Sequence, residues 1–121
     1  KNICSKIPDT CLQAIFVASF LSKNLPEKIS ENLILEKVSY LENIVTLQAR
    51  LSYDKKFLEN FLKKNKLLLS EIKLKQKQST LLGICDNNKT RNFINSGGEL
   101  NYLYLFKDNE EYLKLIIRKC Y

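Results

Sequence analysis

Cysteine usage constrains the fold of this chain most, because it has four cysteines and no histidine. No two of Cys4, Cys11, Cys85 and Cys120 have the Cys-x-x-Cys spacing of a zinc ribbon or a thioredoxin-like site. Of the three pairings that four cysteines allow, Cys4–Cys11 with Cys85–Cys120 is preferred, because each bridge closes its own segment without crossing the other. The alternative is four buried free thiols in a cytosolic protein, since free cysteine packs as a small apolar side chain.

The length of 121 residues fits one domain, which we expect to cover residues 1–121. Apolar residues make up 45% of the chain and charged residues 27%, as in globular proteins and unlike disordered ones. The longest apolar stretch, Leu12–Leu21, has about half of the ~20 residues that a transmembrane helix needs. The chain has no methionine and begins at Lys1, so we expect that a preceding segment such as a signal peptide has been removed.

Lysine dominates the charge of the chain. The formal net charge is +7, and only Arg50, Arg91 and Arg118 among the 20 basic residues are arginines. Planar, bidentate recognition of phosphates and bases relies on arginine. This composition therefore favours a general attraction to anionic surfaces over specific binding of nucleic acid.

The first helix is predicted over about Cys11–Lys23. Thr10 and Gln13 have the spacing of a capping box. Large apolar residues recur at helical spacing, at Leu12, Ile15, Phe16 and Phe20. Pro26 ends the helix, because its ring disfavours helical backbone at the preceding residue.

The clearest strand is predicted at Val45–Tyr53, where apolar and polar residues alternate strictly. A less regular apolar run precedes it, at Leu33, Leu35, Val38 and Tyr40. Glu42 and Asn43 supply turn chemistry between the two runs. This arrangement predicts a β-hairpin.

A long helix capped by Asp54 is predicted to follow the hairpin. One side of it is an apolar stripe formed by Leu58, Phe61, Leu62, Asn65, Leu68, Leu69 and Ile72. Most lysines avoid this stripe and form a cationic face, at Lys55, Lys56, Lys63, Lys64, Lys66 and Lys73. Such a face attracts an acidic protein, anionic lipid headgroups or nucleic acid. The alternative interpretation is a helix face that is only solvated.

A short helix is predicted next, capped by Asp86 or Asn87 and running to Asn95. Gly97 ends it, because glycine accepts the left-handed backbone conformation that closes a helix. The sequence Asn88-Lys89-Thr90 within it matches an N-glycosylation site, which has meaning only in a eukaryotic secretory pathway. We interpret the match as coincidental.

A second hairpin is predicted from strands at Leu100–Lys107 and Tyr112–Cys120, joined by a turn at Asp108 and Asn109. The order helix, hairpin, long helix, short helix, hairpin predicts an α+β fold. We expect both hairpins to form one antiparallel sheet that is packed by helices.

No catalytic constellation is visible in the sequence. Without histidine, the usual general base near neutral pH is missing and a Ser-His-Asp or Cys-His arrangement is excluded. Asp108, Glu110 and Glu111 are the best candidates for a carboxylate pair, but a solvated turn explains them better. We therefore predict a noncatalytic protein with no cofactor and no metal site, and keep a small cleft enzyme as a third hypothesis.

Tyr102, Tyr104 and Phe106 share one face of a predicted strand, near Lys107 and Arg118. Aromatic rings beside basic residues are typical of platforms on which single-stranded nucleic acid stacks. A half-buried strand uses the same residues for cross-strand packing, which is the preferred interpretation.

The last third of the chain combines Cys85, Arg91, Phe93, Ile94, Gly97 or Gly98, Tyr102-Leu103-Tyr104, Asp108-Asn109 and Cys120, and Leu25-Pro26 precedes the first predicted hairpin. In these positions the chain, from about Leu25 to Cys120, resembles uncharacterised exported proteins of proteobacteria. The resemblance implies an envelope or secreted location and a Cys85–Cys120 disulfide, and it carries no known activity. In topology, a helix leading into an antiparallel sheet also resembles periplasmic domains of secretion systems and their lipoprotein pilots.

Together these features predict a noncatalytic binding or accessory protein of the bacterial envelope or secreted fraction. The alternative is a protein that binds nucleic acid or lipid headgroups through the lysine-rich helix face.

Overall fold

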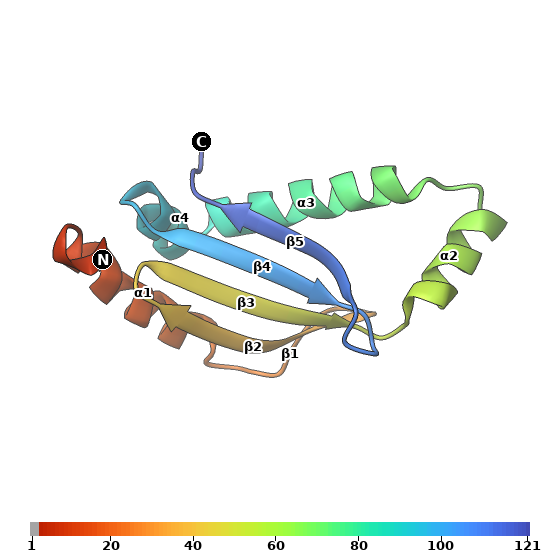
Figure 1. Ribbon diagram of the computed structural model, residues 1–121, viewed down its shortest axis with the longest axis horizontal. Coiled ribbons are helices and arrows are strands. Elements are labelled where there is room, and N and C mark those ends of the chain that lie inside the picture. The colour runs from red at the N-terminus through yellow and green to blue at the C-terminus, as the bar shows by residue number, and fades with distance from the viewer. Residues whose placement is uncertain (1–2) are drawn as a thin grey trace.

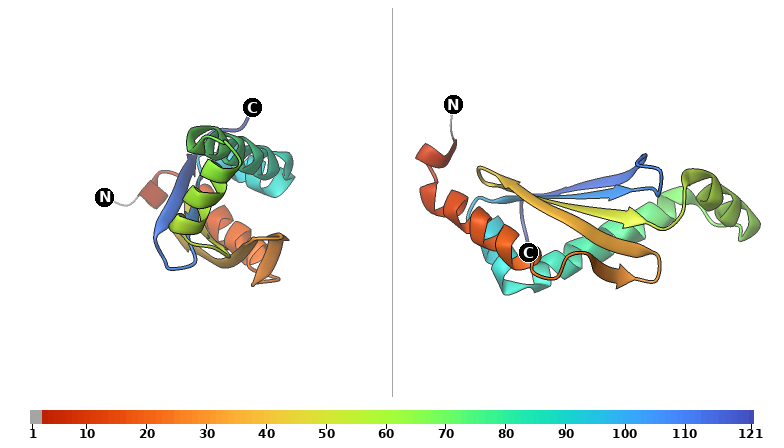
Figure 2. Two further views of the ribbon diagram at one scale, coloured as in Figure 1. Left: turned by 90° about the vertical axis from the view of Figure 1, so that its right-hand side faces the viewer. Right: turned by 90° about the horizontal axis from the view of Figure 1, so that it is seen from below.

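A five-stranded sheet with helices on one of its faces forms the computed structural model, which describes residues 3–121 (Figures 1 and 2). In chain order the elements are η1 Ile3–Ser5, α1 Pro8–Leu21, β1 Glu27–Ser30, β2 Leu33–Leu41, β3 Ile44–Leu51, α2 Lys55–Lys64, α3 Leu69–Asp86, α4 Asn88–Asn95, β4 Glu99–Leu105 and β5 Glu111–Ile117. The predicted α+β class is confirmed. Strand β1, at one edge of the sheet, was not predicted.

The sheet has the order β1-β2-β3-β4-β5, and its two central strands, β3 and β4, run parallel. All other neighbours are antiparallel, so the prediction of an antiparallel sheet is wrong only at the centre. Three helices connect β3 to β4 and return the chain to the end of the sheet where β3 began, as a parallel pair requires. There, Glu99 N donates a hydrogen bond to Asn43 O at 2.9 Å.

The alternation predicted for β3 is confirmed, because Val45, Leu47, Ala49 and Leu51 are buried under the helices while the residues between them are partly exposed. In β2 the register shifts between Leu35 and Lys37. This irregularity places Val38 on the same side of the sheet as Leu35, although Val38 is three positions further along the strand. It explains the uneven spacing of apolar residues in the sequence of β2.

The prediction of one long helix after Asp54 is wrong, because the segment forms two helices, α2 and α3. Asp54 caps α2 as predicted, with Oδ1 accepting a hydrogen bond from Phe57 N at 2.8 Å. The helix ends at Lys64, and Lys66 then adopts a φ of 55°, which turns the chain out of helical conformation. Helix α3 starts at Leu69 and extends to Asp86.

Helix α1 begins at Pro8, before the predicted start, so Thr10 is inside the helix and does not cap it. The buried Thr10 Oγ1 donates a hydrogen bond to Ser96 O at 2.8 Å and thereby joins α1 to the end of α4. Asn87 caps α4 as predicted, accepting from the backbone N–H groups of Lys89 and Thr90. Gly97 follows with a φ of 111°.

Two disulfides fix the ends of the chain to the helices. Cys4–Cys11 joins η1 to the first turn of α1, and Cys85–Cys120 joins the end of α3 to the segment after β5. This is the pairing that the sequence favoured. Within residues 3–121, no helix is long and apolar enough to cross a membrane.

Candidate functional site

Helix α1 is apolar on both of its sides. Its inner side places Ala14, Val17 and Ala18 against β2 and β3, where all three are buried. Its outer side carries Leu12, Ile15 and Phe16, whose exposed fractions are 51%, 40% and 63%. A helix that is apolar all round is normally buried on all sides, so the outer side of α1 has the composition of an interface. We call Leu12, Ile15 and Phe16 the α1 outer face.

A hollow of about 450 Å³ adjoins this face, between α1 and the start of α4. Its walls are formed by Gln13, Phe16, Val17, Ser19, Phe20, Lys23, Lys89 and Asn92. The Nζ atom of Lys89 lies 5.4 Å from the centre of the Phe20 ring, within the range of a cation–π contact. The hollow thus combines aromatic surface with ammonium groups.

The hollow carries positive charge only. Lys23 and Lys89 contribute it, and no carboxylate lines the walls. Neither lysine forms an ion pair with another of the residues that the structure describes. An apolar group that also bears a negative charge fits these walls best, because it covers the rings and pairs with the lysines.

Helix α4 is held rigidly beside α1. Phe93, Ile94 and Thr90 are buried, and the Thr90 hydroxyl donates one bifurcated hydrogen bond to Ile84 O and Asn87 O, which joins α4 to the end of α3. Together with the Thr10–Ser96 hydrogen bond, these contacts fix the shape of the hollow.

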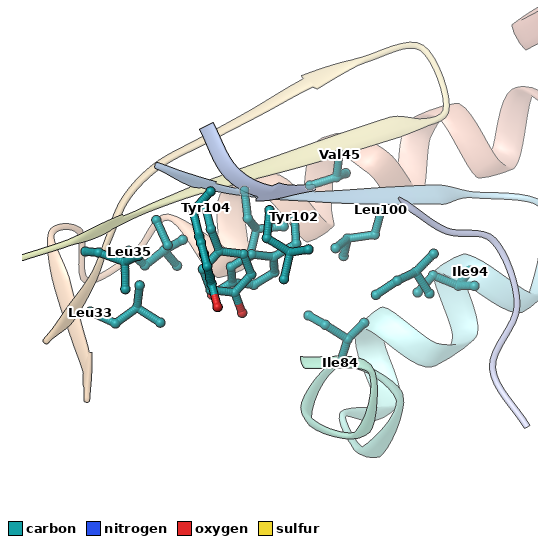
Figure 3. Close-up of a cluster of buried hydrophobic side chains, with 14 of the residues drawn as sticks. Leu33, Leu35, Val45, Ile84, Ile94, Leu100, Tyr102 and Tyr104 are labelled. Carbon is teal, nitrogen blue, oxygen red and sulfur yellow. The ribbon is translucent and has the colours of Figure 1, made fainter. Parts of the chain in front are cut away.

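The predicted aromatic platform belongs to the core. Tyr102, Tyr104 and Phe106 are all buried beneath the helices, and Tyr104 and Phe106 contact the Tyr112 ring of the neighbouring strand, which confirms cross-strand packing. None of the three rings is free for a base to stack on, and Figure 3 shows Tyr102 and Tyr104 among the other core side chains. Tyr104 Oη shares a hydrogen bond with Thr80 Oγ1 and accepts one from Gln76 Nε2 at 3.2 Å. Burial raises the pKa of Tyr102 above its ordinary value. A smaller recess of about 210 Å³ lies over these tyrosines, beside α3.

The six lysines of the predicted cationic face are divided between two helices. Lys55, Lys56, Lys63 and Lys64 lie on α2, Lys66 in the following turn and Lys73 on α3. Two of them have partners: Lys55 pairs with Glu110 at 3.8 Å, and Lys73 Nζ lies 5.4 Å from the centre of the Tyr112 ring. The six therefore do not form a single helix face.

Among the carboxylates named as a catalytic alternative, Asp108 and Glu110 lie on the exposed turn between β4 and β5, and Glu111 is the first residue of β5. Asp108 Oδ1 accepts a hydrogen bond from Glu110 N at 3.2 Å, and Glu110 pairs with Lys55. Residues 3–121 contain no group of three or more metal-ligating side chains. Asn88 of the predicted sequon lies in the first turn of α4, where its Oδ1 accepts a hydrogen bond from Arg91.

Comparison with known proteins finds solved structures with a fold similar to the one described above. No protein-family model and no curated protein matches the chain. Among solved structures, a type II secretion system pilotin from Vibrio cholerae is 20% identical, with a TM-score of 0.68 over 97% of this chain and 95% of that chain. The fold of this chain is similar to the fold of that pilotin. The type 2 secretion system pilotin of Vibrio vulnificus is 15% identical, with a TM-score of 0.67 over 91% and 88% of the two chains.

A third similar structure is a Pseudomonas aeruginosa protein assigned as secreted. It is 16% identical, with a TM-score of 0.64 over 90% of this chain and 88% of that chain. The similarity of fold spans at least 90% of this chain in each comparison.

The apolar residues of the α1 outer face predicted the helix, but the sequence did not show that this face would remain exposed. The signal was present, because only Gln13 and Ser19 interrupt the apolar run Leu12–Leu21. A run of this kind gives a helix two apolar sides, of which one sheet can cover only one.

Proposed function

We propose that the protein is a noncatalytic, pilotin-like accessory protein of the bacterial envelope. It binds an apolar, acidic segment of a secretion-system component on the α1 outer face and in the adjoining hollow. The observation that carries this proposal is the exposure of Leu12, Ile15 and Phe16 on a helix whose opposite side is core. Similarity of fold to two pilotins supports the class of partner.

The energetics require the outer face and the hollow to act together. Full burial of one large apolar side chain contributes about 1.5–3 kcal/mol, and these side chains are already partly covered. Association costs at least about 4 kcal/mol in lost freedom of motion. With exposed fractions of 51%, 40% and 63%, Leu12, Ile15 and Phe16 together contribute about 2–5 kcal/mol, which only balances this cost. Pairing of Lys23 and Lys89 with carboxylates then adds affinity and orientation.

Two further observations support the location and the absence of catalysis. Two disulfides indicate folding in an oxidising compartment, outside the cytoplasm. Among the described residues, the groups whose pKa is shifted are the Glu36–Arg50 ion pair and the tyrosines Tyr53, Tyr102 and Tyr112. Each shift moves the pKa away from neutral pH, whereas a general acid or base needs a pKa near the pH at which it acts.

Site-specific photo-crosslinking in the envelope of the bacterium that carries the chain tests the proposal. A photoreactive amino acid at Ile15 should form one main adduct, which mass spectrometry identifies as a secretion-system component. The Phe16→Asp change should abolish that adduct, and the same probe at Ser39, which is exposed on the sheet, should not form it. Adducts at Ile15 with unrelated proteins only, or none at all, would refute the proposal.

A further inference from the structure

Helix α2, the turn that joins it to α3 and the start of α3 expose five large apolar side chains. Phe57 and Phe61 on α2 stack at 6.5 Å between ring centres. The turn itself and the first residue of α3 add Leu67, Leu68 and Leu69. All five side chains are between 38% and 62% exposed. We call these five residues the α2–α3 tip.

Lysines surround the tip. Between Lys55 and Leu69 the chain has five lysines and a single acidic residue, Glu59. Lys56, Lys63, Lys64 and Lys66 form no ion pair with other residues in the described range 3–121. Their charge is therefore available to an external partner.

The tip projects from the body of the protein. In Figure 1 and in the right-hand view of Figure 2, α2 and the start of α3 extend past the ends of the strands, so the sheet does not cover them. The turn is ordered by hydrogen bonds from Leu67 N to Leu62 O at 2.9 Å and from Lys66 N to Lys63 O at 3.3 Å. These hydrogen bonds hold Leu67 and Leu68 in an ordered turn at the projecting end of the molecule.

We propose that the α2–α3 tip docks on an anionic phospholipid surface. Apolar side chains on a projecting turn that the sheet does not cover enter the boundary between headgroups and acyl chains, and the adjacent lysines pair with the headgroups. The net charge of +7 adds long-range attraction to the same surface. The phosphates of nucleic acid would pair with the lysines, but nucleic acid has no apolar region in which the three exposed leucines could be buried. This site is separate from the α1 outer face and does not depend on the function proposed for that face.

Flotation with vesicles tests the proposal on the purified chain. At low salt the protein should float with vesicles of phosphatidylcholine mixed with phosphatidylglycerol and not with phosphatidylcholine alone, and physiological salt should weaken this binding. The triple change Lys63→Gln, Lys64→Gln, Lys66→Gln should reduce binding by roughly a hundredfold, at about fivefold per lysine. The double change Leu67→Ser, Leu68→Ser should also release the protein.

A matched control keeps net charge constant. The triple change Lys6→Gln, Lys37→Gln, Lys114→Gln removes the same charge from exposed lysines outside the tip and should bind within a few-fold of the parent protein. Circular dichroism should show that every variant is folded, because all of these side chains are exposed. An equal loss in both triple variants, or binding to duplex DNA without binding to vesicles, would overturn the proposal. The Phe16→Asp change, which should abolish the Ile15 adduct, should leave vesicle binding unchanged. The two proposals can therefore fail separately.

Discussion

Arg50 holds Glu36 by three hydrogen bonds on the face of the sheet that the helices leave open. The Arg50 Nε atom lies 3.1 and 3.0 Å from the two carboxylate oxygens, and Nη2 lies 2.8 Å from Oε1. Gln48 Nε2 donates to the same carboxylate at 2.8 Å, and Arg50 Nη1 donates to Phe106 O at 3.1 Å. These contacts join β2 and β3 to the end of β4 and lower the pKa of Glu36, chiefly through the hydrogen bonds from Arg50.

Replacing Arg50 should destabilise the sheet. Arg50→Gln removes the charge-assisted hydrogen bonds to Glu36 and the bond to Phe106 O, which should lower the free energy of unfolding by about 1–3 kcal/mol in urea denaturation. The control is Arg118→Gln, since the pair of Arg118 with Glu99 has an arginine side chain that is 72% exposed. That change should have almost no effect on stability. Equal effects of both changes would contradict the role assigned to the network.

The contribution of this pair should depend on pH in one direction. The folded-state pKa of Glu36 lies below its ordinary value of 4.5. Its stabilisation is therefore complete above the unfolded-state pKa and is lost as the pH falls through the folded-state pKa. The difference in unfolding free energy between the parent protein and the Arg50→Gln variant should shrink as the pH is lowered from neutral to below 4.5. A difference that stays constant over this range would show that packing, and not charge, stabilises the pair.

The two disulfides should contribute unequally to stability. Cys85–Cys120 spans a sequence separation of 35 residues, against 7 for Cys4–Cys11. In the chain-entropy description, the double change to serine should cost about 4 kcal/mol for the long loop and about 2.5 kcal/mol for the short one. Thermal unfolding of the two double variants measures this order. The reverse order would indicate that Cys4–Cys11 stabilises the protein through the contacts of η1 with α1 in addition to the entropy of loop closure.

Two glycines should respond oppositely to alanine. At Gly98, an added Cβ would lie 2.5 Å from Cζ of Phe93, whose ring is buried. Overpacking there should cost about 1–3 kcal/mol. At Gly83, within α3, no atom lies within 4 Å of an added Cβ, so alanine should stabilise the helix by about 0.5–1 kcal/mol. Stability measured for both variants under one set of conditions checks the pair, and destabilisation by Gly83→Ala would contradict the open space beside α3.

Local signals in the sequence predicted local structure well. The alternation in Val45–Tyr53 gave β3 and its buried side, and Asp54 and Asn87 gave the starts of α2 and α4. The parallel pairing of β3 with β4 was missed, because alternation shows which side of a strand is buried but not which strand lies beside it. The break at Lys66 was missed because neither glycine nor proline marks it and apolar residues continue at helical spacing across it.

The candidate sites were predictable only in part. The lysines near the α2–α3 tip were recognised from their charge, while Leu68 and Leu69 were assigned to the core-facing stripe of one long helix. The break at Lys66 places both leucines in solvent instead. In α1 the apolar residues predicted the helix. The sequence does not show which of the two apolar sides is buried, because the buried side includes small alanines that fit closely against strands.

The two sides of α1 should differ in what their substitution costs. The double change Leu12→Ser, Phe16→Ser alters exposed side chains and should change the free energy of unfolding by less than about 0.5 kcal/mol each. Val17→Ser alters a buried neighbour on the same helix and should cost about 2 kcal/mol or more, because it opens a cavity and buries a hydroxyl. Urea denaturation of the variants separates the two cases. If the outer-face variant lost as much stability as Val17→Ser, the outer face would be part of the folded core, and α1 would have no apolar surface to offer a partner.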